Sequence, residues 1–118
     1  MLTRDDVRRI ALSQPEAYEA DHHGIPSFRV GKKIFCTIHQ DLPRAMLKLD
    51  PEDQRNLSEG GPGVIEPVAG YWGKNGSTFV WFERIDEADL AGLMRMAWVQ
   101  VASKALQANV LHGIHKGG

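Results

Sequence analysis

Residues 23–36 read His-Gly-Ile-Pro-Ser-Phe-Arg-Val-Gly-Lys-Lys-Ile-Phe-Cys. Two short runs flank the pair Gly31-Lys32, which suits a two-residue turn with glycine at its first central position. In the first run Phe28 and Val30 alternate with polar residues, as in a strand that buries one face only. The stretch therefore predicts a β-hairpin in an antiparallel sheet that is covered on one side.

The neighbouring strands predict which side chains face outward, because successive side chains of a strand point to opposite faces. In the second strand of the hairpin we expect the core residues to be Ile34, Cys36 and Ile38, and the outward residues to be Lys33, Phe35, Thr37 and His39. In residues 44–49 the expected core residues are Ala45, Leu47 and Leu49, and the outward ones are Arg44, Met46 and Lys48. The open face is thus predicted to carry cations interleaved with an aromatic ring and a thioether.

Capping signals predict three helices. Thr3, with Asp6 in the reciprocal position, begins a helix that Pro15 ends. Asp50 caps a short helix that stops before Gly60. Asp86 caps a long final helix, whose apolar stripe comprises Leu90, Leu93, Met94, Ala97, Trp98, Val101, Ala105 and Leu106.

The remaining segments complete the order helix, three strands, short helix, two strands, long helix. Residues 64–68 and 78–84 are predicted strands, and residues 70–76 a loop. Residues 18–23 form either a loop or an irregular edge strand, and the tail over 109–118 is expected to fray. This order predicts a two-layer α+β sandwich with helices on one face of the sheet.

Length and composition favour one globular domain over residues 1–118. The chain has a hydrophobic share of 42% and a net charge of −1, so it lacks the basic excess of proteins that bind nucleic acid through overall charge. It shows no apolar run of membrane-spanning length, and its single cysteine, Cys36, suits a reducing compartment. We expect a cytoplasmic monomer without a membrane partner or cofactor.

Histidine pairs raise the question of a metal site. His22 and His23 are adjacent in an extended segment, where neighbouring side chains point to opposite faces. His112 and His115 have helical ligand spacing but no cysteine partner. The sequence therefore predicts no metal site.

Ser27, with a histidine and Asp21 nearby in sequence, is the only local set that suggests a nucleophile. Such triads depend on three-dimensional geometry, which sequence neighbours seldom supply, so we expect the Ser27 hydroxyl to bond the backbone. Cys36 is expected to be packed and unreactive. We predict that the protein is not an enzyme.

Several runs together resemble the MmcQ/YjbR family of small bacterial proteins. They are Ala11-Leu12-Ser13, Pro15-Glu16, residues 23–30, Lys33-Ile34-Phe35, Leu47-Lys48, Trp98 and Lys104. The resemblance implies a fold shared in outline with frataxin-like proteins and type III secretion chaperones, and members are described as probable DNA-binding proteins. One branch of the family carries a His, Asn, Lys, His and Trp cluster near residues 70–76, of which this chain keeps at most one Trp and one Lys.

Two functions are predicted. The first is weak, salt-sensitive nucleic-acid binding on the open face, with contacts from Arg29, Lys33, Phe35, Arg44, Lys48 and Lys74. It requires the cations to converge without carboxylate neighbours and without a helix across the face. The alternative is a small protein-binding adaptor or chaperone-like module that holds a partner with Phe35 and with Tyr71 and Trp72, a pair that glycines flank on both sides.

Overall fold

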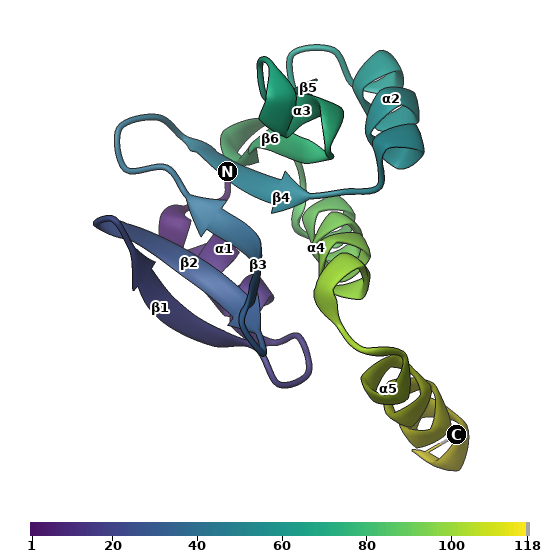
Figure 1. The fold of residues 1–118 in the computed structure, drawn as a ribbon. Coiled ribbons are helices and arrows are strands. Elements are labelled where there is room, and N and C mark those ends of the chain that lie inside the picture. Colours follow the sequence, from purple (N-terminus) through teal and green to yellow (C-terminus); the bar gives the residue numbers. More distant parts are fainter. Residues whose placement is uncertain (118) are drawn as a thin grey trace.

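Six strands form one antiparallel sheet in the order β1-β2-β3-β4-β6-β5 in the computed structural model (Figure 1), which describes the backbone of residues 1–117 and the side chains of residues 1–110. The strands are β1 (Tyr18–His22), β2 (Ile25–Val30), β3 (Lys33–Ile38), β4 (Arg44–Lys48), β5 (Ile65–Pro67) and β6 (Ser77–Trp81). The helices are α1 (Arg4–Leu12), α2 (Pro51–Gly60), α3 (Tyr71–Lys74), the 3-10 helix η1 (Phe82–Arg84), α4 (Glu87–Val101) and α5 (Lys104–Gly117). The predicted α+β class with an antiparallel sheet is confirmed.

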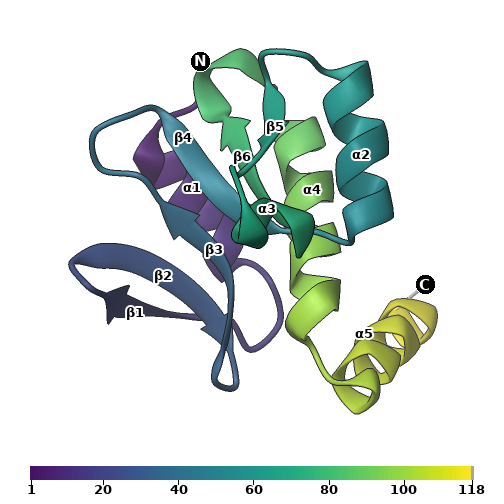
Figure 2. The same ribbon diagram turned by 45° about the horizontal axis from the view of Figure 1, so that its top comes forward.

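One face of the sheet is covered and the other is open. Helices α1 and α4 pack against the central strands and against each other. Figure 2 shows both helices behind the sheet, α3 in front of β6, and α5 extending away from the other elements. The face on which α3 lies, called the open face below, is where the predicted cations should lie. The condition that no helix lie across this face is not met at β6, which the four-residue helix α3 contacts.

Local side-chain caps set the helix starts as predicted. Thr3 and Asp6 form a reciprocal capping box at α1. The Asp50 carboxylate accepts backbone N–H bonds in the first turn of α2, and the Asp86 carboxylate does so for Asp89 of α4. These short acceptors satisfy backbone donors that have no partner within the helix.

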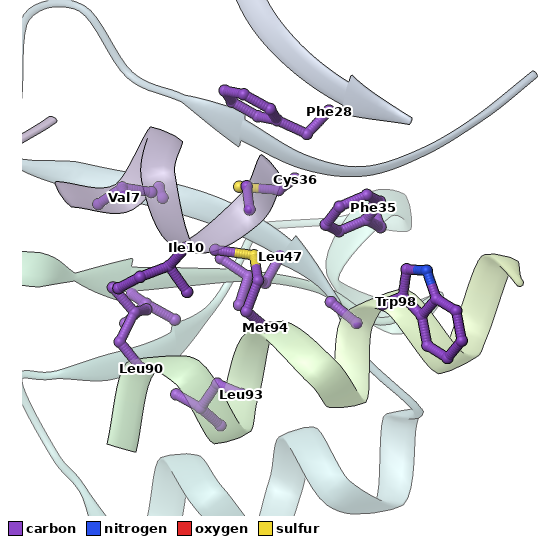
Figure 3. Close-up of a cluster of buried hydrophobic side chains, with 14 of the residues drawn as sticks. Val7, Ile10, Phe28, Phe35, Cys36, Leu47, Leu90, Leu93, Met94 and Trp98 are labelled. Carbon is purple, nitrogen blue, oxygen red and sulfur yellow. The ribbon is translucent and has the colours of Figure 1, made fainter. Parts of the chain in front are cut away.

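The core lies between the sheet and the pair α1 and α4. Figure 3 shows its side chains, which include Phe28, Leu47, Met94 and Trp98, all at most 1% exposed. The Trp98 indole N–H donates to the Pro15 carbonyl at 2.9 Å, so this large ring is buried without an unpaired donor.

A β-bulge in β3 reverses the predicted position of Phe35. Phe28 pairs with Cys36, whereas Arg29 pairs with Ile34, so Phe35 is the extra residue of the bulge. Phe35 is 0% exposed and lies among the core side chains (Figure 3). The prediction that Phe35 faces outward and contacts nucleic acid was therefore wrong, because one inserted residue shifts the alternation and moves Ile34 outward instead.

The chain elsewhere forms more and shorter elements than predicted. Residues 18–22 form the edge strand β1, and a turn through His23 and Gly24, both with positive φ, joins it to β2. The predicted loop at 70–76 contains the short helix α3, and the last strand ends at Trp81 rather than Arg84.

The predicted long C-terminal helix is interrupted. Helix α4 ends at Val101, and Ser103 begins α5, where its hydroxyl accepts the Leu106 N–H at 3.1 Å. Ser103 is thus an N-cap that the apolar stripe obscured. The tail predicted to fray is helical as far as Gly117, and Gly118 lies outside the described residues.

Candidate functional site

Strand register arranges the side chains of the open face in three rows. The first row pairs Lys48 with Ser77. The second row runs through Ser27, Thr37, Met46, Phe79 and Glu66. The third row pairs Arg44 with Trp81. Because these rows alternate with core residues such as Ala45 and Leu47, their side chains stand on the side away from α1 and α4.

A groove of about 740 Å³ lies on the open face. Its apolar lining includes Ile25, Ile34, Met46, Val68, Trp72, Phe79 and Val101. Its lysine, histidine and glutamine side chains are His22, Lys33, His39, Lys48 and Gln100. No aspartate or glutamate is among the described residues that line it, although the whole chain has a net charge of −1.

Lys33 and Lys48 supply the positive charge of the groove. Lys33 is exposed and Lys48 is half-buried. Within the described side chains neither lysine forms an ion pair, whereas Arg8, Arg9 and Arg44 each do. The two ammonium groups are therefore available to an anionic ligand, at the end of the face marked by the row of Lys48 and Ser77.

Helix α3 holds Trp72 against the groove through close backbone packing. A Cβ added to Gly73 would overlap the carbonyl oxygen of Val68, and one added to Gly76 would overlap that of Leu49. Gly76 also has a φ of 101°, which strongly favours glycine. Only glycine therefore fits the two positions that fix the helix, and Trp72 lines the groove although it remains 64% exposed.

At the opposite end of the open face, Arg44 is stacked on an aromatic ring and joined to its neighbours by a hydrogen bond and an ion pair. The Arg44 guanidinium lies 3.6 Å from the centre of the Phe79 ring, and its Nε–H donates to Nδ1 of His39 at 3.3 Å. Glu66 lies 3.9 Å from Arg44 and accepts the indole N–H of Trp81 at 2.8 Å. The requirement that Arg44 have no carboxylate neighbour is not met, and Arg44 does not line the groove.

The other predicted cations lie outside the groove. Arg29 donates to the Ser27 hydroxyl at 3.0 Å and to the Asp21 carbonyl at 3.2 Å, so it braces β1 against β2. Lys74 is exposed on α3 but is not among the lining residues. Of the six predicted nucleic-acid contacts, the structure brings only Lys33 and Lys48 together in the groove.

The predicted aromatic pair stands out from the surface. Tyr71 is 72% exposed, and its ring meets that of Trp72 edge to face with centroids 5.6 Å apart. The Asn75 side chain donates to the Tyr71 carbonyl at 2.8 Å and so steadies the helix that carries both rings.

Ser27 and Cys36, the two residues considered as nucleophiles, are both engaged in the packing of the sheet. The Ser27 hydroxyl donates to the Ala20 carbonyl at 2.7 Å, which confirms the predicted backbone bond. Cys36 is buried, and this burial raises the pKa of its thiol far above the usual range, so the reactive thiolate is disfavoured.

The histidines do not form a cluster with other metal ligands in the described part of the chain. The rings of His22 and His23 lie 4.7 Å apart rather than on opposite faces, because His23 leaves the strand at the turn. No group of three or more His, Cys, Asp or Glu side chains that could hold a metal ion occurs among the described residues. The side chains of His112 and His115 lie outside them.

None of the helices described here combines the length and the apolar character needed to cross a membrane.

Comparison with known proteins places the chain in a family. The family model YjbR matches residues 12–100. The crystal structure of the Deinococcus radiodurans protein DR2400, described by the family-model domain DUF419, is similar at 25% sequence identity with a TM-score of 0.74, covering 92% of this chain and 88% of that one. Among curated proteins none matches. The chain belongs to the YjbR family.

Proposed function

We propose that this protein binds single-stranded nucleic acid, with DNA as the expected ligand, weakly and in a salt-sensitive manner, in the groove of the open face. The observation that carries the proposal is the charge of the groove: Lys33 and Lys48 line it, and no carboxylate does so among the described residues. Local positive charge in a nearly neutral chain attracts phosphates without the overall basic excess of a duplex-binding protein.

The apolar part of the groove favours a single strand over a duplex. Met46, Phe79 and Trp72 offer flat or soft apolar surface, on which unpaired bases stack whatever their sequence. In a duplex the base faces are stacked on one another, so they cannot reach these side chains. The resemblance to the MmcQ/YjbR family, whose members are described as probable DNA-binding proteins, agrees with this ligand.

Fluorescence anisotropy with a labelled single strand and the matching duplex, at low and at high salt, tests the proposal. The double variant Lys33→Glu/Lys48→Glu should bind the single strand at least about tenfold more weakly, because two phosphate contacts become repulsive. The control Arg55→Glu makes the same kind of change on an exposed residue of α2 outside the groove, and it should change affinity less than about threefold. Absence of binding at low salt, or equal losses in both variants, contradicts the proposal.

A protein-binding adaptor is the second candidate, because Tyr71 and Trp72 are exposed on a fixed helix beside an apolar groove. Aromatic rings of this kind are typical interface anchors. This function predicts self-association or peptide binding that Trp72→Ala abolishes and Lys33→Glu/Lys48→Glu leaves intact. Light scattering and titration with apolar peptides measure both, and loss of binding in the lysine variant favours the nucleic-acid function instead.

A further inference from the structure

We infer that His39 determines base specificity in the groove by donating a hydrogen bond from Nε2 to O4 of thymine, where cytosine carries an amino group, so that thymine is preferred over cytosine. This inference rests on the proposed function and specifies its ligand. It follows from three observations: the partner of Nδ1, the exposure of Nε2, and the place of the ring at one end of the groove.

The hydrogen bond from Arg44 selects one tautomer of His39. The Nε–H of Arg44 donates to Nδ1 at 3.3 Å. A guanidinium only donates hydrogen bonds, so Nδ1 must present its lone pair, and the proton of the neutral imidazole is then on Nε2. His39 therefore offers a donor, not an acceptor, at its second nitrogen.

Arg44 is held in the orientation that this bond requires. Its guanidinium stacks on Phe79, with Glu66 on another side at 3.9 Å, and its side chain is only 20% exposed. Stacking of the planar group limits its rotation, which a lysine at this position would not achieve. Arg44 is thus a positioning residue that acts through His39.

The Nε2 atom of His39 is accessible. It has no hydrogen-bond partner within the described residues, and no buried side-chain nitrogen or oxygen among them lacks a partner. Nε2 is therefore in contact with solvent. Because His39 lines the groove and its ring lies 6.3 Å from that of Phe79, the donor stands beside the surface on which a base would stack.

The positions of the cations set the direction of the ligand. Along β4 the row of Arg44 lies four residues from Lys48, or about 13 Å at the rise of a strand. Phosphates near Lys33 and Lys48 leave the His39 end of the groove to a base. There a donor complements O4 of thymine and opposes the amino group that cytosine carries at the same ring position.

Binding of oligo-dT and oligo-dC of equal length tests the inference, because the two pyrimidines are closely matched in size. The wild-type protein should bind oligo-dT about fivefold more tightly. His39→Phe, which keeps a flat ring without the donor, should bring this ratio close to one, and Arg44→Met should lower it. His39→Gln, whose amide can both donate and accept, should lower it as well. Circular dichroism of each variant confirms that it is folded.

The possible results separate this inference from the function on which it rests. A dT:dC ratio near one in the wild type, or a ratio unchanged by His39→Phe, overturns the inference while leaving nucleic-acid binding intact. Absence of binding to either strand overturns both. Independently of any ligand, a ¹⁵N spectrum of the neutral His39 ring should show the proton on Nε2, and a proton on Nδ1 overturns the inference even where DNA binds.

Discussion

The two ends of the open face differ in whether their cation is free to bind a ligand, although both cations, Lys48 and Arg44, come from β4. Lys48 and Arg44 lie four residues apart on β4 and point to the same side of the sheet. Lys48 has no ion pair within the described residues, whereas Arg44 is stacked on Phe79 and lies beside Glu66. Strand alternation therefore predicts the face on which a cation lies but not whether that cation is free.

The difference comes from the neighbouring strands. Lys48 lies opposite Ser77, which offers no charge and no ring, whereas Arg44 lies opposite Trp81 and close to Phe79. A planar guanidinium stacks well on aromatic rings and loses little when partly desolvated, while a lysine ammonium remains hydrated. The aromatic end of the face thus immobilises its cation, and the serine end leaves its cation for a ligand.

The largest expected effect comes from Phe35, which the β-bulge places in the core behind the lysine end of the face. Phe35→Ala should lower the free energy of unfolding by about 3–5 kcal/mol, as for other buried phenylalanines. Urea denaturation measures this loss, and Ile34→Ala, on the open face, is the neighbouring control with a smaller expected loss. A stable Phe35→Ala protein with weakened DNA binding would mean that the ring faces the ligand after all.

Arg44→Met should reduce stability by about 1–2 kcal/mol, because it removes the cation–π contact with Phe79 and the ion pair with Glu66. The dependence of DNA affinity on salt should stay close to that of the wild type, because Arg44 is not a phosphate contact in the proposed site. Thermal unfolding and anisotropy at several salt concentrations measure the two quantities. If the slope of log affinity against log salt clearly decreased, Arg44 would be a phosphate contact like Lys48, and the two ends of the face would not differ in this respect.

Lys48→Met should have the opposite profile. Stability should change by less than about 0.5 kcal/mol, because Lys48 is half-buried at the surface and forms no ion pair within the described residues. The single-strand affinity should fall about threefold, and the slope of log affinity against log salt should decrease by about 0.7, the value for one phosphate contact on a single strand. The same salt series provides the test, and an unchanged slope would remove Lys48 from the site.

The smallest effect concerns α1, beneath the covered face. Hydrogen bonds from the Thr3 backbone N–H, and then from its hydroxyl, hold the pKa of Asp6 below its usual value. A lowered pKa in the folded state stabilises the protein at pH values above the unfolded pKa, and this contribution is lost as pH falls through the folded pKa. Asp6→Asn should therefore be slightly less stable than the wild type at pH 7, with a difference that disappears in acid.

Denaturation of both proteins over a range of pH measures this difference. DNA binding at pH 7 should be unchanged in Asp6→Asn, because the cap lies on the covered side of the sheet. A stability difference that persists in strong acid would show that the charge of Asp6 is not its cause.

Local signals were sufficient for most of the fold and for part of the candidate site. The caps at Thr3, Asp50 and Asp86, the turn at Gly31 and the alternation in residues 44–49 all depend on neighbours in sequence, and the structure has them as expected. Lys48 was predicted outward for the same reason, and it lines the groove. Lys33 also lines the groove, but the bulge pairs it with the core residue Val30, so strand alternation alone does not account for its position.

Other features of the site depend on contacts between distant residues. Nothing local marks the β-bulge that turns Phe35 into the core, since it follows from pairing of β2 with β3. Helix α3 forms because Gly73 and Gly76 pack against the backbone of Val68 and Leu49, so its sequence alone suggested a loop. Glu66 reaches Arg44 only because β5 joins the sheet beside β6.

The sequence by itself determined the fold class, the starts of α1, α2 and α4, the covered and open faces of β4, and family membership, because these depend on short-range hydrogen bonding and on side-chain periodicity. Only the tertiary structure decided which cations are free and which are stacked, how Trp72 is placed, and how His39 is hydrogen-bonded. Those properties arise where strands and helices from separate parts of the chain meet, and the electrostatic and packing environment of each side chain is set there.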